Sequence, residues 1–451
     1  MTQPPIAVVG AGIGGLVLGR ILAQSAIPYV IYERLPSRKQ YNYGVTLLSE
    51  QLDTLSDITG IDRGEFVSRV AVDGAIGGRG RVESRWPSVF TTYALGSTRA
   101  AHDLHFGCFR ANRGKVESLL ASGLNIRYDS TIDSVDTSSG KPVVHFATEG
   151  SQDRGRHHAA QHDVVVAADG VHSTARQCLL PSKRPEVAEV VAIYGKRRIP
   201  KELLLGREWP QSRPAYMDFK IEDQRHAVDE IKDVVTRISI ANVEDDADAA
   251  DMEWVYSRPL RGDTDPLYKP NRSTGEANAI HESFFDEVRL LCDMKHEFPP
   301  LWSRIFDVEE MKNDRKLSWL MRVVYAPVKA VLRDLAKKGV LFIGDSIHAE
   351  PIIGGQGYNN AIRDATILAD SISQTGLHAK DERGVQLSLV DLGRFYKKRQ
   401  HEWRRGVFHS QRLLNRMHKT SPAHIPTSLD AMADSFKEKK AVASSEEDHK
   451  L

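Results

Sequence analysis

The opening of the chain contains the pattern that most constrains its fold. An apolar run over residues 6–9 leads into a turn in which Gly10, Gly12 and Gly15 form the spacing G-x-G-x-x-G. A helical apolar pattern and a second short apolar run follow, and that run ends on Glu33. The order strand, tight turn, helix, strand and acid predicts a parallel β-α-β unit with a ligand at the turn.

Each part of this unit has a physical reason to be there. Gly10 permits the tight turn, Gly12 lets a pyrophosphate approach the backbone, and Gly15 lets the helix pack closely on the strand. The helix N-terminus offers free N–H groups and the positive end of its dipole to phosphates. Glu33 lies at the spacing expected of a carboxylate that binds a ribose hydroxyl, which favours FAD or NAD over NADP. The unit does not separate FAD from NAD, and a glycine-rich turn without a ligand is the alternative.

A second stretch, late in the chain, has a similar arrangement of an apolar strand, an acid, a glycine-rich turn and a helix. An apolar run over residues 340–343 ends in Gly344-Asp345, and a glycine-rich loop over residues 351–357 precedes a helical pattern over residues 359–373. We expect Asp345 to bind a sugar or ribityl hydroxyl and the loop to surround the reactive ring of a cofactor. Because NAD needs only the first unit, two such units favour the longer, two-part cofactor FAD.

Two further stretches carry candidate residues. The buried strand pattern over residues 163–168 runs into Asp169-Gly170-Val171-His172-Ser173-Thr174-Ala175-Arg176. Asn112 has the character of an N-cap for a helix over residues 113–120, with Arg110 and Arg113 at its start. Gly44 lies in a strand-like run where its missing side chain would let the backbone pass close to a ligand.

Length and composition bound the remaining possibilities. A chain of 451 residues is too long for one core, and a net charge of +1 gives no overall field that would attract nucleic acid or an anionic membrane. Three separated cysteines fit a reducing compartment without disulfides, so we expect a cytoplasmic protein. We expect no membrane span, no cleavable signal and no metal site.

The predicted fold class is α/β, with a Rossmann-like FAD-binding domain and a second, mostly antiparallel β-sheet domain for the substrate. A strand-like pattern from Val67 to Tyr93, with turns at Asp73-Gly74 and Gly77-Gly78, is assigned to the second domain or its border. The predicted FAD-binding domain is discontinuous and consists of residues 1–70, 102–185 and 326–416. The predicted substrate domain consists of residues 71–101 and 186–325. The polar C-terminal tail, residues 417–451, is expected to be disordered.

The G-x-G-x-x-G turn, the stretch ADGVHSTAR and the stretch GDSIHAEPIIGGQGYNNAIRDA, in this order, resemble the para-hydroxybenzoate-hydroxylase-type FAD-dependent monooxygenases. The resemblance is greatest to the fungal members that act in secondary metabolite biosynthesis. It implies that NAD(P)H reduces FAD, that O2 forms a flavin C4a-hydroperoxide, and that one oxygen atom hydroxylates or epoxidises a small apolar or aromatic substrate.

The resemblance also implies roles for single residues. Glu33 would bind the adenosine ribose, Arg113 (or, as the second candidate, Arg110) would contact FAD, and Asp345 would bind the ribityl or pyrophosphate region. Asp169 lies in the stretch that the family associates with FAD and the nicotinamide donor. Three further positions would face the isoalloxazine through their backbone: Gly355, Gly357 and Tyr358.

The substrate side is less well defined. The family's Arg-Gly pair has its nearest match at Gly195 to Arg198, so Arg198 is a candidate anchor, and Tyr216, like Tyr194, is a candidate to orient or deprotonate a phenol. For each of these, a role in the core or on the surface is the alternative. His348 either hydrogen-bonds near the flavin or packs in the core. The competing functions are a flavoprotein oxidase or dehydrogenase and a non-redox binding protein of the same fold.

Overall fold

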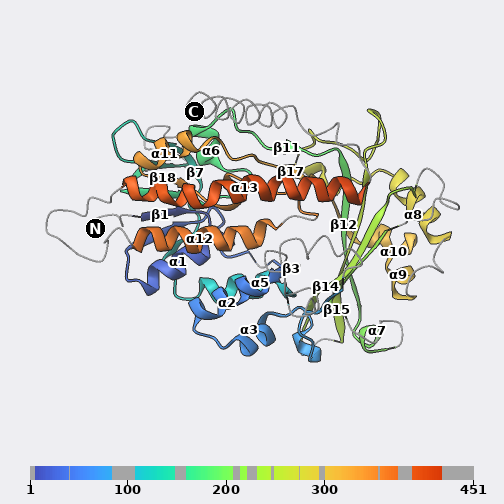
Figure 1. The fold of residues 1–451 in the computed structure, drawn as a ribbon. Coiled ribbons are helices and arrows are strands. Elements are labelled where there is room, and N and C mark those ends of the chain that lie inside the picture. Colours follow the sequence, from blue (N-terminus) through green and yellow to red (C-terminus); the bar gives the residue numbers. More distant parts are fainter. Residues whose placement is uncertain are drawn as a thin grey trace, which may run out of the picture.

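The computed structural model describes residues 6–39, 41–83, 107–147, 159–206, 214–220, 231–244, 248–273, 275–293, 300–353, 356–373 and 389–418. Gly355 and the tail beyond residue 418 lie outside these ranges. Figure 1 shows a parallel sheet surrounded by helices on one side of the molecule and a long antiparallel sheet on the other. The predicted α/β fold class is confirmed.

The parallel sheet is built from short, apolar strands. Its five strands pair in the order β18 (Val340–Phe342), β10 (Val164–Ala167), β1 (Ile6–Val9), β2 (Tyr29–Tyr32) and β6 (Ile126–Arg127). Every residue of the first four strands is buried, as expected where helices cover both faces of a sheet. Because β18, β10 and β1 are parallel neighbours, the residues that follow each of them meet at one edge of the sheet.

Helices follow the strands as the apolar spacing predicts. Asn112 caps α5, since its side-chain oxygen accepts a hydrogen bond from the Lys115 backbone N–H at 3.0 Å. The α-helices are α1 (Ile13–Gln24), α2 (Ser49–Thr59), α3 (Arg63–Val70), α5 (Arg113–Ala121), α6 (Thr174–Leu179), α7 (Glu202–Leu205), α8 (Ser283–Asp293), α9 (Pro300–Ile305), α10 (Val308–Asn313), α11 (Lys329–Lys337), α12 (Gly357–Ser373) and α13 (Leu389–Met417). Short 3-10 turns are η1 (Gly74–Ile76), η4 (Gly275–Asn278) and η6 (Gly344–Ser346).

The second sheet is antiparallel except at one edge. Its strands pair in the order β16 (Arg315–Trp319), β12 (Val190–Pro200), β15 (Ala249–Pro259), β14 (Val235–Val243), β13 (Tyr216–Lys220) and β4 (Val82–Glu83), and only β4 runs parallel to its neighbour. One face packs its apolar side chains against α8, α9 and α10, which Figure 1 places on the outer side of the sheet. The other face turns toward the parallel sheet.

A small hairpin joins the two sheets. It consists of β3 (Gly44–Leu48) and β5 (Cys108–Asn112), and Asn112 donates a hydrogen bond to the backbone oxygen of Ala241 in β14 at 2.9 Å. The C-terminal end of α13 also reaches the antiparallel sheet, because Leu413 and Leu414 pack with Val190. The other small sheets are β7 (Ile132–Asp136), β8 (Val143–Phe146) and β9 (Ala159–Gln161), and β11 (Glu186–Val187) with β17 (Arg322–Val323).

The expected strand character from Val67 onward is wrong at its start. Residues 67–70 belong to α3, which begins after Asp62, and the Asp62 carboxylate accepts hydrogen bonds from the Gly64 and Glu65 backbone N–H groups. Phe66 and Val70, four residues apart, give this helix a buried face. The helical spacing of these apolar residues therefore outweighs the β-propensity of the valines. Residues 84–93 of the expected hairpins lie outside the described ranges. The division of the chain into two domains stays a proposal, which the pairing of β4 with β13 supports.

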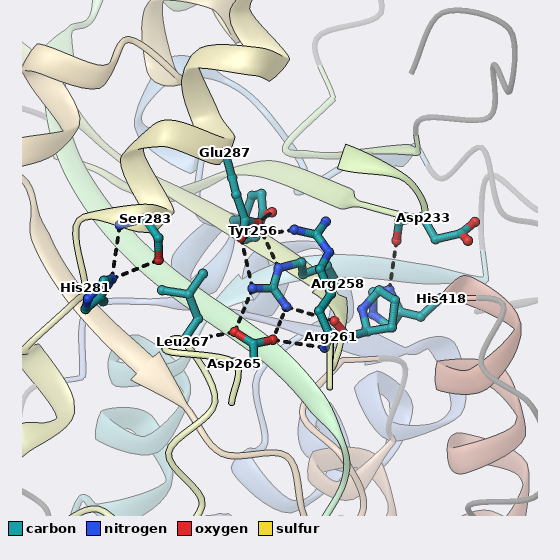
Figure 2. A network of polar contacts seen from close by, with 11 residues as sticks. Asp233, Tyr256, Arg258, Arg261, Asp265, Leu267, His281, Ser283, Glu287 and His418 are labelled. Atoms are coloured by element: carbon teal, nitrogen blue, oxygen red, sulfur yellow. Dashed lines mark hydrogen bonds and ion pairs between the residues drawn. The ribbon is translucent and has the colours of Figure 1, made fainter. Parts of the chain in front are cut away.

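A buried charge network fixes the outer face of the antiparallel sheet (Figure 2). The Arg258 guanidinium lies between two carboxylates: it donates to Asp265 at 2.5 and 3.0 Å and to Glu287 of α8 at 2.8 and 2.9 Å. Tyr256 also donates to Glu287, and Arg261 forms a 3.1 Å ion pair with it. Burial alone would raise the pKa of Asp265, but the hydrogen bonds from Arg258 lower it. The network ties the loop after β15 and α8 to the sheet.

We expect Arg258→Met to destabilise the protein strongly, because it leaves the Asp265 carboxylate buried without its counter-ion and leaves Glu287 with Arg261 alone. Breaking a buried pair from one side costs about 3–5 kcal/mol, which corresponds to a fall of roughly 10 °C in the thermal midpoint of unfolding. Differential scanning calorimetry measures this thermal midpoint. The control is Arg289→Met, which breaks the exposed pair with Asp286 and should cost less than about 1 kcal/mol. Equal shifts for the two variants would contradict a structural role for the network.

Candidate functional site

The glycines of the first turn divide into two kinds. Gly10 has φ +100°, and a Cβ there would lie 2.7 Å from the Ala168 carbonyl oxygen of the neighbouring strand end. A Cβ on Gly15 would overlap the carbonyl oxygen of Gly10. A Cβ on Gly12 would meet no atom of the described residues within 4 Å. The fold therefore requires Gly10 and Gly15, whereas Gly12 borders open space.

The open space at Gly12 lies at the start of α1. Gly12 is the N-cap, no side chain caps the helix, and its first turn holds no acidic residue, so the N–H groups and the positive dipole end are available to an anion. Glu33 lies beside the same turn: its carboxylate accepts hydrogen bonds from the Ala11 N–H at 2.9 Å and the Leu35 N–H at 3.1 Å. The phosphate and ribose halves of a nucleotide site are thus adjacent.

The turn after β18 presents a carboxylate with spare hydrogen-bonding capacity. Gly344 has φ +58°, and Asp345 follows it at the edge of a cavity. Among the described residues, no hydrogen-bond donor reaches the Asp345 carboxylate. Burial raises its pKa, and Glu350 adds to the increase, while His348 and Arg113 oppose it. A desolvated carboxylate of this kind fits a hydroxyl donor on a ligand.

A second carboxylate, Asp364 of α12, holds this turn in place. It accepts hydrogen bonds from the Gly344 N–H at 2.8 Å, His348 Nε2 at 2.5 Å, Arg399 Nε at 2.7 Å and Trp403 Nε1 at 2.7 Å. Burial alone would raise the pKa of Asp364, but the neighbouring His348 and Arg399 lower it to about 2. The fully buried His348 stacks on Trp403. His348 therefore supports the turn after β18, which favours the interpretation that it packs in the core.

The middle stretch is tied to the late one through Arg176. Its guanidinium donates to four backbone oxygens: Ser346 at 2.7 Å, Val171 at 2.5 Å, Lys183 at 3.0 Å and Asp345 at 3.4 Å. Asp169, at the end of β10, accepts from the Thr174 N–H at 2.8 Å, and its other carboxylate oxygen is buried without a partner among the described residues. Burial raises the pKa of Asp169. Two carboxylates with open acceptor positions therefore follow neighbouring strands.

A cavity of about 580 Å³ lies between the parallel sheet's loops and the antiparallel sheet. The residues on its cofactor side come from β3, from the starts of α5 and α12 and from the turn after β18, and include Gly44, Arg113, Gly357, Tyr358 and Asp345. The loop before α12 borders it as well. Glu350 anchors that loop, because its carboxylate accepts from the Gln356 N–H at 2.7 Å and from Ser410 Oγ at 2.6 Å.

The opposite wall is one face of the antiparallel sheet, and strand register arranges its residues in two rows. We call the first the tyrosine row; in strand order from β16 to β14 it consists of Leu317, Tyr194, Val255 and Arg237. We call the second the glutamate row; from β16 to β13 it consists of Arg315, Lys196, Glu253, Ser239 and Tyr216. Where both rows cross a strand, their residues are two positions apart, so both rows lie on the same face of the sheet.

Glu253 is a buried acid of this wall. It accepts hydrogen bonds from Tyr194 Oη at 3.0 Å, Arg110 Nη2 at 3.1 Å and Ser239 Oγ at 3.2 Å, and from the Gly44 N–H at 3.3 Å. Burial raises the pKa of Glu253, and the Arg110 charge opposes this. A Cβ on Gly44 would overlap Arg110 Nε, so Gly44 makes room for this ion pair. Arg110 therefore faces the antiparallel sheet, which leaves Arg113 as the better placed of the two arginines for a cofactor.

Arg113 lies among aromatic rings on the cofactor side. Its guanidinium donates to Glu117 at 2.7 Å and to the Tyr43 hydroxyl, and it lies 4.0 Å from the centroid of Tyr41. The Tyr358 hydroxyl is buried without a hydrogen-bond partner among the described residues. Gly357 is close to the turn of β18, since a Cβ there would lie 3.1 Å from Asp345 Oδ1.

Two of the residues expected on the substrate side, Tyr216 and Arg198, have different positions. Tyr216 is buried, lines the cavity, and lies under the guanidinium groups of Arg110 and Arg237, at 5.4 and 4.7 Å from its ring centroid. Arg198 is exposed and is not among the lining residues, so the geometry gives it no support as an anchor. Lys196, two residues earlier on β12, lines the cavity instead.

Comparisons with known proteins bear on this geometry. The model of the family described as "FAD binding domain" matches residues 3–194 and 308–383, which is more than half of the chain. The FAD-dependent monooxygenase adaC of Aspergillus niger is 30% identical, over 82% of this chain and 85% of that protein. The FAD-dependent monooxygenase aptC of Emericella nidulans is 28% identical, over 89% of this chain and 91% of that protein.

The chain belongs to the FAD-binding monooxygenase family. The resemblance to the para-hydroxybenzoate-hydroxylase type, and to its fungal secondary-metabolite members, is confirmed.

Two solved structures share this fold. CtdE in complex with FAD and substrate 4 has a TM-score of 0.61 at 13% identity and covers 98% of this chain and 100% of its own. HpxO of Klebsiella pneumoniae, complexed with FAD and uric acid, has a TM-score of 0.57 at 17% identity and covers 96% of this chain and 92% of its own.

The residues present fit the cofactor of this family. The open space at Gly12 and the uncapped start of α1 suit a pyrophosphate, Glu33 suits a ribose, and the unpartnered Asp345 suits a hydroxyl of the ribityl chain. Gly357 and Tyr358 border the cavity where a ring would lie. Gly355 lies outside the described residues.

We expect Gly12→Val to separate binding from folding. Because a side chain at Gly12 meets open space, the apoprotein should keep its thermal midpoint, while FAD affinity should fall by roughly 100-fold or more through the loss of backbone contacts to the pyrophosphate. Fluorescence titration of the apoprotein with FAD measures the affinity. Gly15→Val is the contrasting variant, since its side chain would overlap Gly10 and destabilise the apoprotein itself. Wild-type FAD affinity in Gly12→Val would mean that the turn is structural only.

Proposed function

We propose that this FAD-binding monooxygenase uses NAD(P)H and O2 to hydroxylate or epoxidise a small apolar or aromatic substrate. The observation that carries the proposal is the cavity itself. Asp345 and Tyr358 of the cofactor side and the tyrosine row of the antiparallel sheet line one chamber, so a bound flavin ring and a substrate would share it. The fungal relatives named as FAD-dependent monooxygenases support the same reaction class.

When bound, FAD supplies the electron transfer and the activation of O2, which amino-acid side chains do not provide. The residues of this chain bind and orient. Glu33, Asp345 and Arg113 would hold the cofactor, and Asp169 would serve it from the neighbouring strand. The apolar side chains of Leu317 and Val255 would exclude water from the substrate.

The tyrosines of the wall are suited to orient a phenol. Burial raises the pKa of Tyr194, and the adjacent Glu253 adds to the increase. Burial also raises the pKa of Tyr216. Both hydroxyls therefore stay protonated at neutral pH and would not act as bases. The Tyr194 proton is donated to Glu253, so Tyr194 would orient a phenol by accepting a hydrogen bond from it. A role of Arg198 as substrate anchor stays a prediction from sequence.

Among the alternatives, a binding protein without flavin chemistry is disfavoured. Such a protein has no use for two carboxylates with open acceptor positions: Asp169 Oδ1 is buried without a partner among the described residues, and no described donor reaches the Asp345 carboxylate. An oxidase or dehydrogenase would share the cofactor site, so only the fate of oxygen separates it from a monooxygenase.

The proposed location is cytoplasmic, which three free cysteines support. Among the described residues, no helix is both long enough and apolar enough to cross a lipid bilayer.

The test begins with the purified protein, which should show an oxidised flavin spectrum and stoichiometric FAD. Mixing with NADPH or NADH without oxygen should reduce the flavin. Turnover under ¹⁸O2 with a panel of polycyclic phenols should then give a product that carries one ¹⁸O atom, detected by mass spectrometry. A desaturated product without ¹⁸O, together with hydrogen peroxide, would favour the oxidase. A colourless protein that takes up no FAD would contradict the proposal.

A further inference from the structure

The long helix α13 carries a row of cations on its exposed face. Side chains three or four residues apart lie on one face of a helix, and exposed residues recur along α13 at that spacing. The row extends over roughly 30 Å, since a helix rises about 1.5 Å per residue. We call its five exposed cations the basic stripe: Lys397, Lys398, Arg405, Arg412 and Arg416.

No acid among the described residues neutralises the basic stripe, because none forms an ion pair with any of its cations. Glu402 is the only acid in the sequence from residue 394 to residue 417. It is already paired with the buried Arg399 and, at 3.9 Å, with Arg363. The net charge of +1 averages over this local excess, whose field acts within a screening length of about 8 Å at physiological salt.

An aromatic side chain lies within the basic stripe. Phe408 is placed between Arg405 and Arg412 on the helix face and is 38% exposed. The Arg412 guanidinium lies 5.5 Å from the centroid of its ring. Both the charge and the ring are therefore presented to whatever binds this face.

Two aliphatic side chains border the stripe on the neighbouring helix. α11 packs along α13, where Gln400 Nε2 donates to the Pro327 backbone oxygen at 2.6 Å. Val328 follows directly and is 54% exposed, and Val331, one turn later, is 37% exposed. The surface made by the two helices is thus basic with an apolar border.

A line of uncompensated cations fits two classes of partner, nucleic acid and the surface of an anionic membrane. The apolar side chains favour the membrane. A phosphate backbone offers no apolar contact to Val328 and Val331, whereas the interfacial layer of a bilayer takes up such side chains together with Phe408. Clusters of about four to eight Lys and Arg residues on a helix are typical of contacts with anionic phospholipid headgroups.

We propose that α13 docks the protein on the surface of an anionic membrane. The basic stripe binds the headgroup phosphates and carboxylates, and Phe408, Val328 and Val331 enter the interfacial layer. The association is peripheral and reversible, because a few cations and apolar side chains bind far more weakly than a spanning helix. This surface is separate from the cavity, so the proposal does not depend on the proposed function.

Docking through α13 would hold the cavity close to the bilayer. Ser410, on the buried face of α13, donates to the Glu350 carboxylate at 2.6 Å. The loop that Glu350 anchors includes Ile352, which lines the cavity and is 54% exposed. A helix is about 10 Å across, so the loop lies roughly one helix diameter from the docked face. Apolar small molecules concentrate in the bilayer, next to this loop.

Co-sedimentation of the full-length, FAD-loaded protein with vesicles tests the proposal. Phosphatidylcholine vesicles with about 30% phosphatidylserine should bind the wild type at least about tenfold more tightly than pure phosphatidylcholine vesicles at low salt. Added salt should weaken this binding, because it screens the charges. Arg405→Gln/Arg412→Gln should bind the anionic vesicles at least about tenfold more weakly. Phe408→Ser should weaken binding by about threefold or more at unchanged charge.

The matched control is Arg63→Gln/Arg69→Gln, which removes the same charge from exposed positions of α3. Figure 1 shows α3 well below α13, with α12 and α2 between them. This variant should bind anionic vesicles as the wild type does. FAD content and the rate of flavin reduction are read for every variant, so that failure of the proposed function is seen separately from failure of docking.

The proposal is wrong if the wild type does not bind the anionic vesicles at low salt, or binds neutral vesicles equally well. It is also wrong if Arg405→Gln/Arg412→Gln binds like the wild type, or if the α3 control loses as much affinity. Unchanged binding by Phe408→Ser would contradict insertion into the interfacial layer. Binding of a duplex oligonucleotide, but not of anionic vesicles, would assign the basic stripe to nucleic acid instead.

Discussion

The parallel pairing of β18, β10 and β1 is the constraint on which the rest of the structure depends. Because these strands are neighbours and point the same way, the turn at Gly10, the Asp169 turn and the Asp345 turn lie at one edge of the sheet. Each turn alone is a weak ligand site. Together they present an uncapped helix start and two carboxylates with open acceptor positions to one long molecule.

Buried polar contacts hold that edge in one arrangement. Asp364 accepts four hydrogen bonds around the β18 turn, and Arg176 donates to backbone oxygens of both the middle and the late stretch. Buried ions of this kind add little net stability, but removing one partner is expensive, so they act to specify a geometry. The ion pair of Arg110 and Glu253 has the same effect where the β3–β5 hairpin meets the antiparallel sheet. The cavity between the two sheets is therefore bounded by fixed groups on both sides.

The sequence predicted what local patterns determine. The first β-α-β unit, the Asn112 cap and the α12 helix follow from glycine spacing, capping chemistry and helical periodicity, and each is present. The pattern after Val67 predicts hairpins from its β-branched residues and glycines, and this is wrong for residues 67–70, which belong to a helix with Phe66 and Val70 on its buried face.

Local sequence patterns could not predict the wall of the cavity, because strand register forms it. Arg237, Glu253 and Lys196 lie far apart along the chain and meet only through the register of three antiparallel strands. Alternation within each strand would have shown which residues share a face, but not which strands are neighbours. Arg198 was favoured because a local motif pointed to it, whereas the exposed end of β12 removes it from the cavity.

A crystal structure of the protein grown with FAD tests the central claim most directly. The account predicts that the pyrophosphate lies at the Gly12 backbone, that the ribityl chain donates a hydrogen bond to Asp345, and that the ring enters the cavity opposite the tyrosine row. Crystals that contain no FAD at saturating concentration, or FAD bound without contacts to Gly12 and Asp345, would contradict it.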